Sequence, residues 1–293
     1  MSARLDDRVT GLRERTQPLL GWLARNRRPL LAVCALLFVG GTAWSASRLA
    51  LDPDRLDWRP LLAMAMVTAP LTLLHGALAL VLLGKAARVP AGLGWAARTS
   101  AYGQLAELLP LPGGAIVRTG ALVAAGGRAG EATMLVLASA LLWIALAGCA
   151  AGGYLLLSGG IDLVGLPLAL GGAVGLVATT ALLWARAGAA NALLTVVHRA
   201  FGLLLNAVRL LLAFMVIGAP VGLGATLPFV LANVAGSAAS IAPGGLGVSE
   251  ALAALLAGAT AIKPAAAFLA VALDRVVGAA FVAAVVGALQ LRR

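Results

Sequence analysis

Six ionisable residues lie inside or beside long apolar stretches of the sequence: Glu107, Arg118, Arg209, Glu250, Asp274 and Arg275. Charged groups inside a membrane are costly, so they are candidates for function by default. Three acids and three bases can pair with one another, which lowers the cost of burying them and keeps the carboxyl groups ionised. Arginine also forms forked hydrogen bonds to phosphate. The set is therefore typical of a site for an anionic group, or of structural ion pairs.

Asp274 and Arg275 are neighbours in the sequence. Adjacent residues point about 100° apart on a helix, so we expect each to have another partner. A purely structural ion pair is the alternative interpretation. For Glu250 three roles are open, because a carboxylate can hold an arginine, cap a helix N-terminus or bind a cationic headgroup such as an aminoacyl amine.

The tripeptide Pro-Gly-Gly occurs twice in hydrophobic sequence, and the residues expected to break helices are Pro110, Pro112, Gly113, Gly114, Pro243, Gly244, Gly245 and Gly247. Proline removes a backbone donor, and glycine lacks the side chain that restricts the backbone. Within a membrane, such breaks are tolerated only where they are buried in protein or line a cavity. The half-helix after a break presents free N–H groups suited to a phosphate. Two breaks at corresponding places indicate a transporter's binding site.

The composition indicates a polytopic membrane protein. Of 293 residues, 61% are hydrophobic and 11% charged, and the mean hydropathy is +0.99, which excludes an ordinary soluble domain. The net charge of +11 comes mainly from arginines at segment ends, which favours topology determinants facing anionic lipid over nucleic-acid binding. The two cysteines lack metal-ligand spacing, no catalytic motif is present, and we expect no cofactor or metal.

The hydrophobic pattern predicts an all-α fold with six full spans, at about 29–47, 60–84, 132–157, 162–184, 201–218 and 264–290. Two stretches, 93–127 and 222–260, are each interrupted by a break, and we interpret them as re-entrant helix hairpins. The second part of the first stretch, about 115–125, is too short to cross a core of ~30 Å. Residues 1–28 form a basic cytoplasmic arm before the transmembrane domain of 29–293. Arg186, His198 and Arg199 are expected on a linker.

The positive-inside rule places both chain ends in the cytoplasm, because most basic loops then face inward. The first hairpin then opens from the cytoplasm and the second from outside. The units 60–157 and 201–290 would have opposite orientation, which is an inverted-topology repeat typical of alternating-access transporters. An alternative keeps the same end locations but makes the hairpins true spans, giving eight crossings in total.

The sequence Ala-Pro-Gly-Gly-Leu-Gly-Val-Ser-Glu at 242–250, followed by Arg275 in the next span, resembles the flippase-like domain of the lysylphosphatidylglycerol synthase transmembrane family. Leu108-Leu109-Pro110 and Arg118 match an earlier motif of that family. The Gly-Glu of that motif is replaced here by Gly114-Ala115, and Glu107 is a candidate substitute for the missing acid. The resemblance covers about residues 30–290.

This resemblance implies a flippase in the bacterial cytoplasmic membrane, as a stand-alone member without the synthase domain and partnered by a separate lipid-modifying enzyme. The substrate would be an anionic or aminoacylated phospholipid, or a polyprenyl-phosphate-linked lipid. The expected substrate-binding residues are Arg118, Arg209, Glu250, Asp274 and Arg275. Two alternatives remain: a membrane-embedded glycosyltransferase or other lipid-modifying enzyme with Glu250 or Asp274 as base, and a scaffold for a partner enzyme.

Overall fold

The computed structural model describes residues 27–49, 57–107, 113–159, 163–239 and 245–291, and these contain helices and no strand. The elements are α2 (Arg27–Leu49), α3 (Trp58–Ala63), the π-helical turn η2 (Met64–Thr68), α4 (Ala69–Ala86), α5 (Leu93–Glu107), α6 (Gly113–Ala124), α7 (Ala129–Gly159), α8 (Gly165–Ala187), α9 (Ala189–Val216), the 3₁₀ turn η3 (Gly224–Thr226), α10 (Leu227–Ala239), α11 (Val248–Ala257) and α12 (Pro264–Leu291). The all-α expectation is confirmed for this part of the chain. The expected basic arm lies outside the described residues except for Arg27 and Arg28.

Among the described residues, five helices are long and apolar enough to cross a membrane: Trp58–Ala86, Ala129–Gly159, Gly165–Ala187, Ala189–Val216 and Pro264–Leu291. They coincide with five of the six expected spans. The first of them runs through α3, η2 and α4 without interruption. The helix α2, of 23 residues, covers the remaining expected span at 29–47. These helices indicate a multi-pass membrane protein.

The expected linker before the fifth span is wrong, because α9 begins at Ala189 and already contains His198 and Arg199. A single residue, Gly188, joins α8 to α9, and its φ of 83° is the left-handed conformation that favours glycine. The sequence from 189 onward is rich in helix-forming alanine and leucine. The charges at 198 and 199 therefore lie within a long helix rather than ending one.

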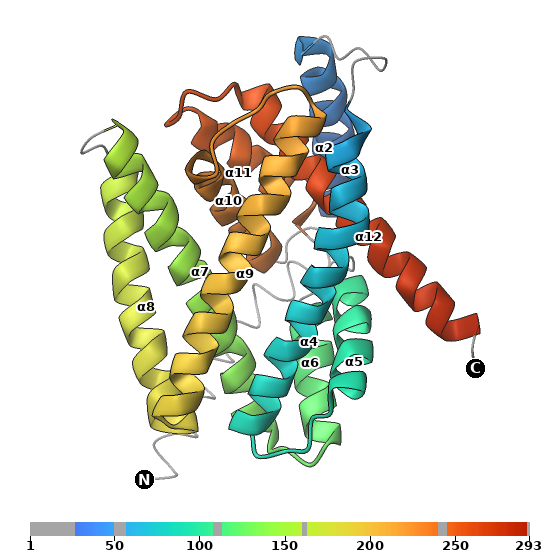
Figure 1. The fold of residues 1–293 in the computed structure, drawn as a ribbon, viewed down its shortest axis with the longest axis vertical. Coiled ribbons are helices and arrows are strands. Elements are labelled where there is room, and N and C mark those ends of the chain that lie inside the picture. The colour runs from blue at the N-terminus through green and yellow to red at the C-terminus, as the bar shows by residue number, and fades with distance from the viewer. Residues whose placement is uncertain (1–26, 50–56, 108–112, 160–162, 240–244, 292–293) are drawn as a thin grey trace.

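Two pairs of short helices lie at opposite ends of the molecule in Figure 1, with α5 and α6 toward the lower end and α10 and α11 toward the upper end. Their lengths are 15, 12, 13 and 10 residues. At 1.5 Å per residue the longest extends about 22 Å, less than a hydrocarbon core of ~30 Å. Of the expected helix breakers, Gly245 and Gly247 precede α11, whereas Gly113 and Gly114 are the first two residues of α6. Pro110, Pro112, Pro243 and Gly244 lie outside the described residues.

The helices α7 and α8 pack closely along one side of the molecule (Figure 1). A Cβ atom at Gly152 would collide with the backbone of Ala169, and one at Gly172 would collide with the backbone of Cys149. Small residues let membrane helices approach to backbone contact, which replaces the hydrophobic driving force that lipid does not provide. This pair therefore depends on glycine at specific positions.

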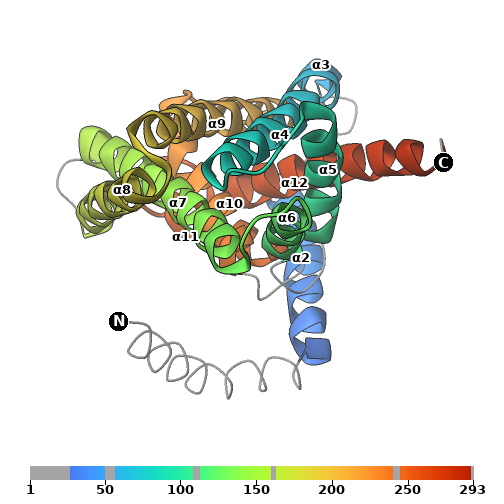
Figure 2. The ribbon, with the colours of Figure 1, turned by 90° about the horizontal axis from the view of Figure 1, so that it is seen from below.

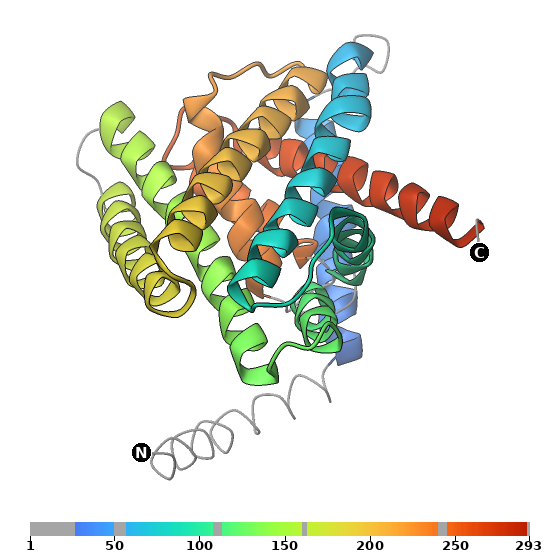
Figure 3. The ribbon, with the colours of Figure 1, turned by 60° about the horizontal axis from the view of Figure 1, so that its bottom comes forward.

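The main hydrophobic core joins α9, α10, α11 and the first half of α12, and it includes the contact of Phe214 with Phe229, whose ring centroids are 5.5 Å apart. The second half of α12 packs on α5, where Val282 and Val286 are buried beside Ala101, and its C-terminal end projects from the molecule, as Figures 2 and 3 show. At its beginning α12 also packs on α2, where Gly41 gives room to the ring of Phe268. Asp274 and Arg275 lie at the point where α12 leaves this core.

Candidate functional site

Glu250 and Arg275 form an ion pair inside the protein. Arg275 Nε lies 3.3 Å from Glu250 Oε1, and the exposed fractions of the two side chains are 10% and 0%. The two facing atoms do not have the alignment of a hydrogen bond. Charge attraction therefore holds this contact without the additional energy of a well-directed donor and acceptor.

Glu250 also caps the half-helix α11. Its Oε2 accepts a hydrogen bond of 2.7 Å from the backbone N–H of Gly247, three residues earlier. Such a carboxylate at the third helical position satisfies one of the donors left free at a helix N-terminus. Gly245 and Gly247 have φ values of 73° and 81°, which explains glycine at these two positions of the break. Glu250 thus has two of the three roles that the sequence left open.

Asp274 pairs with Arg209 on α9. Arg209 Nε lies 2.8 Å from Asp274 Oδ1, and the side chains are 8% and 3% exposed. Arg209 also donates to the backbone oxygen of Asp274 at 3.0 Å and to Oγ1 of Thr72 on α4 at 3.1 Å. Gly278 leaves space for this guanidinium, because a Cβ there would lie 2.9 Å from Arg209 Nη2. The contact joins α4, α9 and α12.

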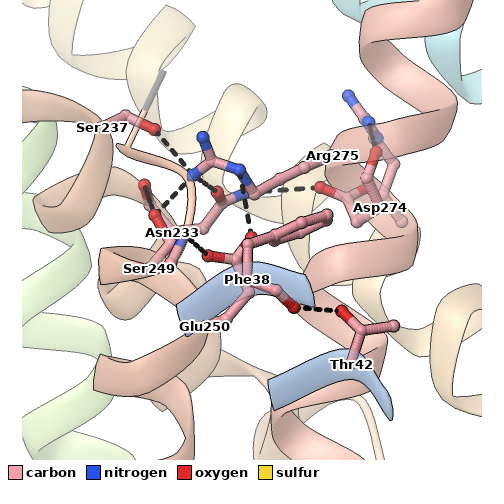
Figure 4. A network of polar contacts seen from close by, with 10 residues as sticks. Phe38, Thr42, Asn233, Ser237, Ser249, Glu250, Asp274 and Arg275 are labelled. Atoms are coloured by element: carbon pink, nitrogen blue, oxygen red, sulfur yellow. Dashed lines mark hydrogen bonds and ion pairs between the residues drawn. The ribbon is translucent and has the colours of Figure 1, made fainter. Parts of the chain in front are cut away.

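Asn233 on α10 links the two ion pairs. Its Nδ2 donates to Asp274 Oδ2 at 3.3 Å, and its Oδ1 accepts from Arg275 Nη1 at 3.4 Å. Arg275 Nη1 also donates to Ser249 Oγ and, at 3.5 Å, to Ser237 Oγ. Figure 4 shows Arg275 reaching from α12 toward these side chains, with Phe38 and Thr42 of α2 beside Glu250. One polar network therefore connects α9, α10, α11 and α12.

Arg118 and Glu107 form a separate ion pair across the first break. Arg118 Nη2 lies 2.7 Å from Glu107 Oε1, and the side chains are 30% and 40% exposed. A Cβ at Gly114 would collide with the Glu107 carboxylate, so glycine at this position lets the acid approach. Arg118 makes no direct contact with Glu250 or Asp274. The expected binding residues are thus divided between two places.

The described residues contain a further polar group that the sequence did not identify as a site. Arg199 on α9 donates to Ser139 Oγ on α7 through Nη2 at 2.6 Å and Nε at 3.2 Å. Its guanidinium carbon lies 4.7 Å from the ring centre of Trp143. The two histidines of the chain stack beside it, with the ring centroids of His75 and His198 3.9 Å apart. The run Val-Val-His-Arg at 196–199, at helical spacing from Ala192, is the signal that indicates a helix here.

Ser249, Ser237 and Thr72 are contacts of the arginines that sequence reasoning also missed, because a single hydroxyl in an apolar stretch carries no pattern. No group of three or more His, Cys, Asp or Glu in the described residues could hold a metal ion. A surface hollow lined by Leu163, Leu255, Leu256 and their neighbours carries no charge, and lies apart from the polar network.

Searches of protein-family models, curated proteins and solved structures found no match to this chain.

Proposed function

We propose that this chain is a lipid flippase of the bacterial cytoplasmic membrane, related to the lysylphosphatidylglycerol synthase transmembrane family. The observation that carries the proposal is the pair Glu250–Arg275: a buried ion pair in the first turn of a half-helix that follows a break in apolar sequence. Buried charges at a broken helix mark substrate sites in membrane transporters. Both residues belong to the motif on which the resemblance rests.

Binding would take place by exchange of ion-pair partners. A headgroup phosphate offers Arg275 two oxygens, and Glu250 offers it a single, poorly aligned contact at 3.3 Å. The phosphate can therefore compete for the guanidinium. The released Glu250 carboxylate would then accept an amine, as an aminoacylated headgroup supplies. The facing atoms of Arg209 and Asp274 are no better aligned, but Arg209 also donates to the Asp274 backbone oxygen at 3.0 Å, and this second contact holds α9 against α12.

The proposed architecture treats α5 with α6, and α10 with α11, as re-entrant hairpins that enter from opposite faces. The units 60–157 and 201–290 are then an inverted repeat with the polar tips toward the middle. A headgroup would move past these tips while the acyl chains remain in lipid. The substrate is an anionic or aminoacylated phospholipid, or a polyprenyl-phosphate-linked lipid, with both chain ends in the cytoplasm and a separate enzyme supplying the modified lipid.

The contacts of the carboxylates favour transport over an enzymatic role. A general base needs a free oxygen within reach of the proton that it removes. Glu250 is held by Arg275 and Gly247, and Asp274 is held by Arg209 and Asn233.

The test is lipid movement in proteoliposomes that contain purified protein and fluorescent phosphatidylglycerol, lysyl-phosphatidylglycerol or a polyprenyl phosphate. We expect at least one lipid to move faster than in empty liposomes. Glu250→Gln and Arg275→Ala should remove this activity, because each breaks the exchanging pair. Glu131→Gln is the matched control, since Glu131 lies in the first turn of α7, outside the network.

The proposal is wrong if no lipid moves although the protein elutes as a single folded species. Turnover of a lipid-linked donor by that protein would instead establish an enzyme. Unchanged transport in both network variants would leave a flippase whose site lies elsewhere.

A further inference from the structure

Arg118, Arg199, Arg209 and Arg275 are the arginines that are not exposed among the side chains that the structure describes. Each of Arg118, Arg209 and Arg275 contacts one carboxylate within 4.0 Å. Within the described residues, Arg199 has no carboxylate at that distance, and its contacts are with the neutral Ser139 and Trp143. Arg199 therefore differs from the other three in having no carboxylate beside its charge.

Arg199 lies deep in a candidate membrane span. It is the eleventh of the 28 residues of α9, about 15 Å from the start of the helix at 1.5 Å per residue. An arginine near the middle of a membrane helix costs roughly 2.5–3.5 kcal/mol on insertion scales. Such residues in membrane proteins face a partner or a substrate path. The described residues supply no carboxylate partner, which favours an anionic ligand.

Ser139 and Trp143 hold the guanidinium in place without neutralising it. Nε and Nη2 both donate to the single Ser139 oxygen, at 3.2 and 2.6 Å, and no contact within the described residues engages Nη1. The Trp143 ring orients the guanidinium plane through a cation–π contact at 4.7 Å. An arginine fixed in this way offers a free edge at little further cost in side-chain entropy.

Arg199 is open to a ligand, because the residue is only partly buried. No contact within the described residues joins it to Arg118 or Glu107, whose own ion pair has side chains 30% and 40% exposed.

We propose that Arg199, held by Ser139 and Trp143, binds the phosphate of an anionic lipid headgroup. The anion site follows from the charges, and the choice of lipid over free phosphate rests on the proposed function. This site is on the α7 and α9 side of the first break, apart from the Glu250–Arg275 pair. A headgroup would then have two successive phosphate contacts, Arg199 and Arg275, on its way through the protein.

The test is binding by isothermal titration in detergent, with soluble dihexanoyl-phosphatidylglycerol, glycerophosphate and inorganic phosphate as separate ligands. We expect the short-chain lipid to bind, and Arg199→Gln to weaken its affinity about tenfold or more, which is the size of a lost charge-assisted hydrogen bond. Arg199→Lys keeps the charge and should retain part of the affinity. Arg98→Gln is the control, because Arg98 is exposed on α5 and contacts only a backbone oxygen.

The site would be overturned if folded Arg199→Gln bound the lipid with the affinity of the wild type. It would also be overturned if the wild type bound none of the three ligands. If Arg199→Gln does not fold, Arg199→Lys decides. An affinity of Arg199→Lys equal to that of the wild type counts against the site, and so does a loss of affinity in Arg98→Gln as large as that in Arg199→Lys. Equal binding of inorganic phosphate would overturn the lipid assignment. Lipid movement measured in parallel separates the two proposals. Lipid binding without lipid transport would refute the proposed flippase function. Transport that is unaffected by Arg199→Gln would refute a phosphate site at Arg199.

Discussion

Arg209 lies 2.8 Å from the carboxylate of Asp274, and Arg118 lies 2.7 Å from that of Glu107, but the surroundings of the two pairs differ. Arg209 and Asp274 are almost fully buried, whereas Arg118 and Glu107 keep about a third of their surface exposed. Removing one member of a buried pair leaves an uncompensated charge. An exposed pair loses little, because water solvates the remaining partner.

We therefore expect Arg209→Ala to destabilise the protein by about 3–5 kcal/mol, because Asp274 stays buried without its counter-charge. Arg118→Ala should cost about 1 kcal/mol or less. Thermal unfolding in detergent measures both, and the double variant Arg209→Ala with Asp274→Ala should recover part of the loss. Equal destabilisation by the two single variants would contradict the assignment of Arg209 to a structural pair.

Three ion pairs join the six ionisable residues that the sequence analysis singled out, but their pairing did not follow from the sequence. Asp274 and Arg275 do have different partners, as the 100° offset between neighbours predicts. The identity of those partners depends on the register between α9, α11 and α12, which hydrophobic periodicity does not determine. The substrate-binding roles of Arg118, Arg209, Glu250, Asp274 and Arg275 stay predictions.

At the scale of elements, apolar runs and helix breakers located the helices within a few residues. The exception is α9, because the charges of His198 and Arg199 predict a linker at a place where the helix continues. Gly188 is the actual boundary, since its positive φ ends α8. Helix boundaries in a membrane protein follow backbone conformation, and a buried arginine is tolerated once Ser139 and Trp143 contact it.

The α7–α8 pair offers a test of packing by adjacent glycines. Gly152→Val should destabilise the protein by about 1–3 kcal/mol, because the added side chain overpacks a backbone contact with Ala169. Gly153→Val is the matched control, since open space surrounds a Cβ at Gly153. Thermal unfolding compares them, and equal loss in both would show that helix propensity rather than the close contact accounts for the effect.

At the scale of the whole molecule, the positions of the helix connections relative to the two membrane faces distinguish re-entrant hairpins from full crossings. The connections after α4 and α6 lie at the lower end in Figure 1, and those after α9 and α11 lie at the upper end. A chain with two re-entrant hairpins would keep the breaks away from both aqueous faces. A chain with full crossings would place each break at the face opposite its hairpin's base.

Cysteine labelling with a membrane-impermeant reagent distinguishes these arrangements, starting from a chain in which Cys34 and Cys149 are replaced by alanine. We expect Gly126→Cys to react only from the cytoplasm and Ala261→Cys only from outside. Ala115→Cys, next to the first break, should not react from outside. Its rapid labelling from outside would establish full crossings, and labelling of 126 and 261 from one side would refute the opposed hairpins.

The distance in sequence between Arg209 and Asp274 affects how the protein is made. The two residues are 65 positions apart, and a ribosome that adds about 5–20 residues per second needs about 3–13 s to synthesise the intervening chain. During this interval Arg209 enters the membrane before its carboxylate exists. Thr72, which is already present, is the earlier of its two partners. The contact of Arg209 with Thr72 can therefore form before the charge is neutralised, and during this interval the arginine has no carboxylate partner from α12.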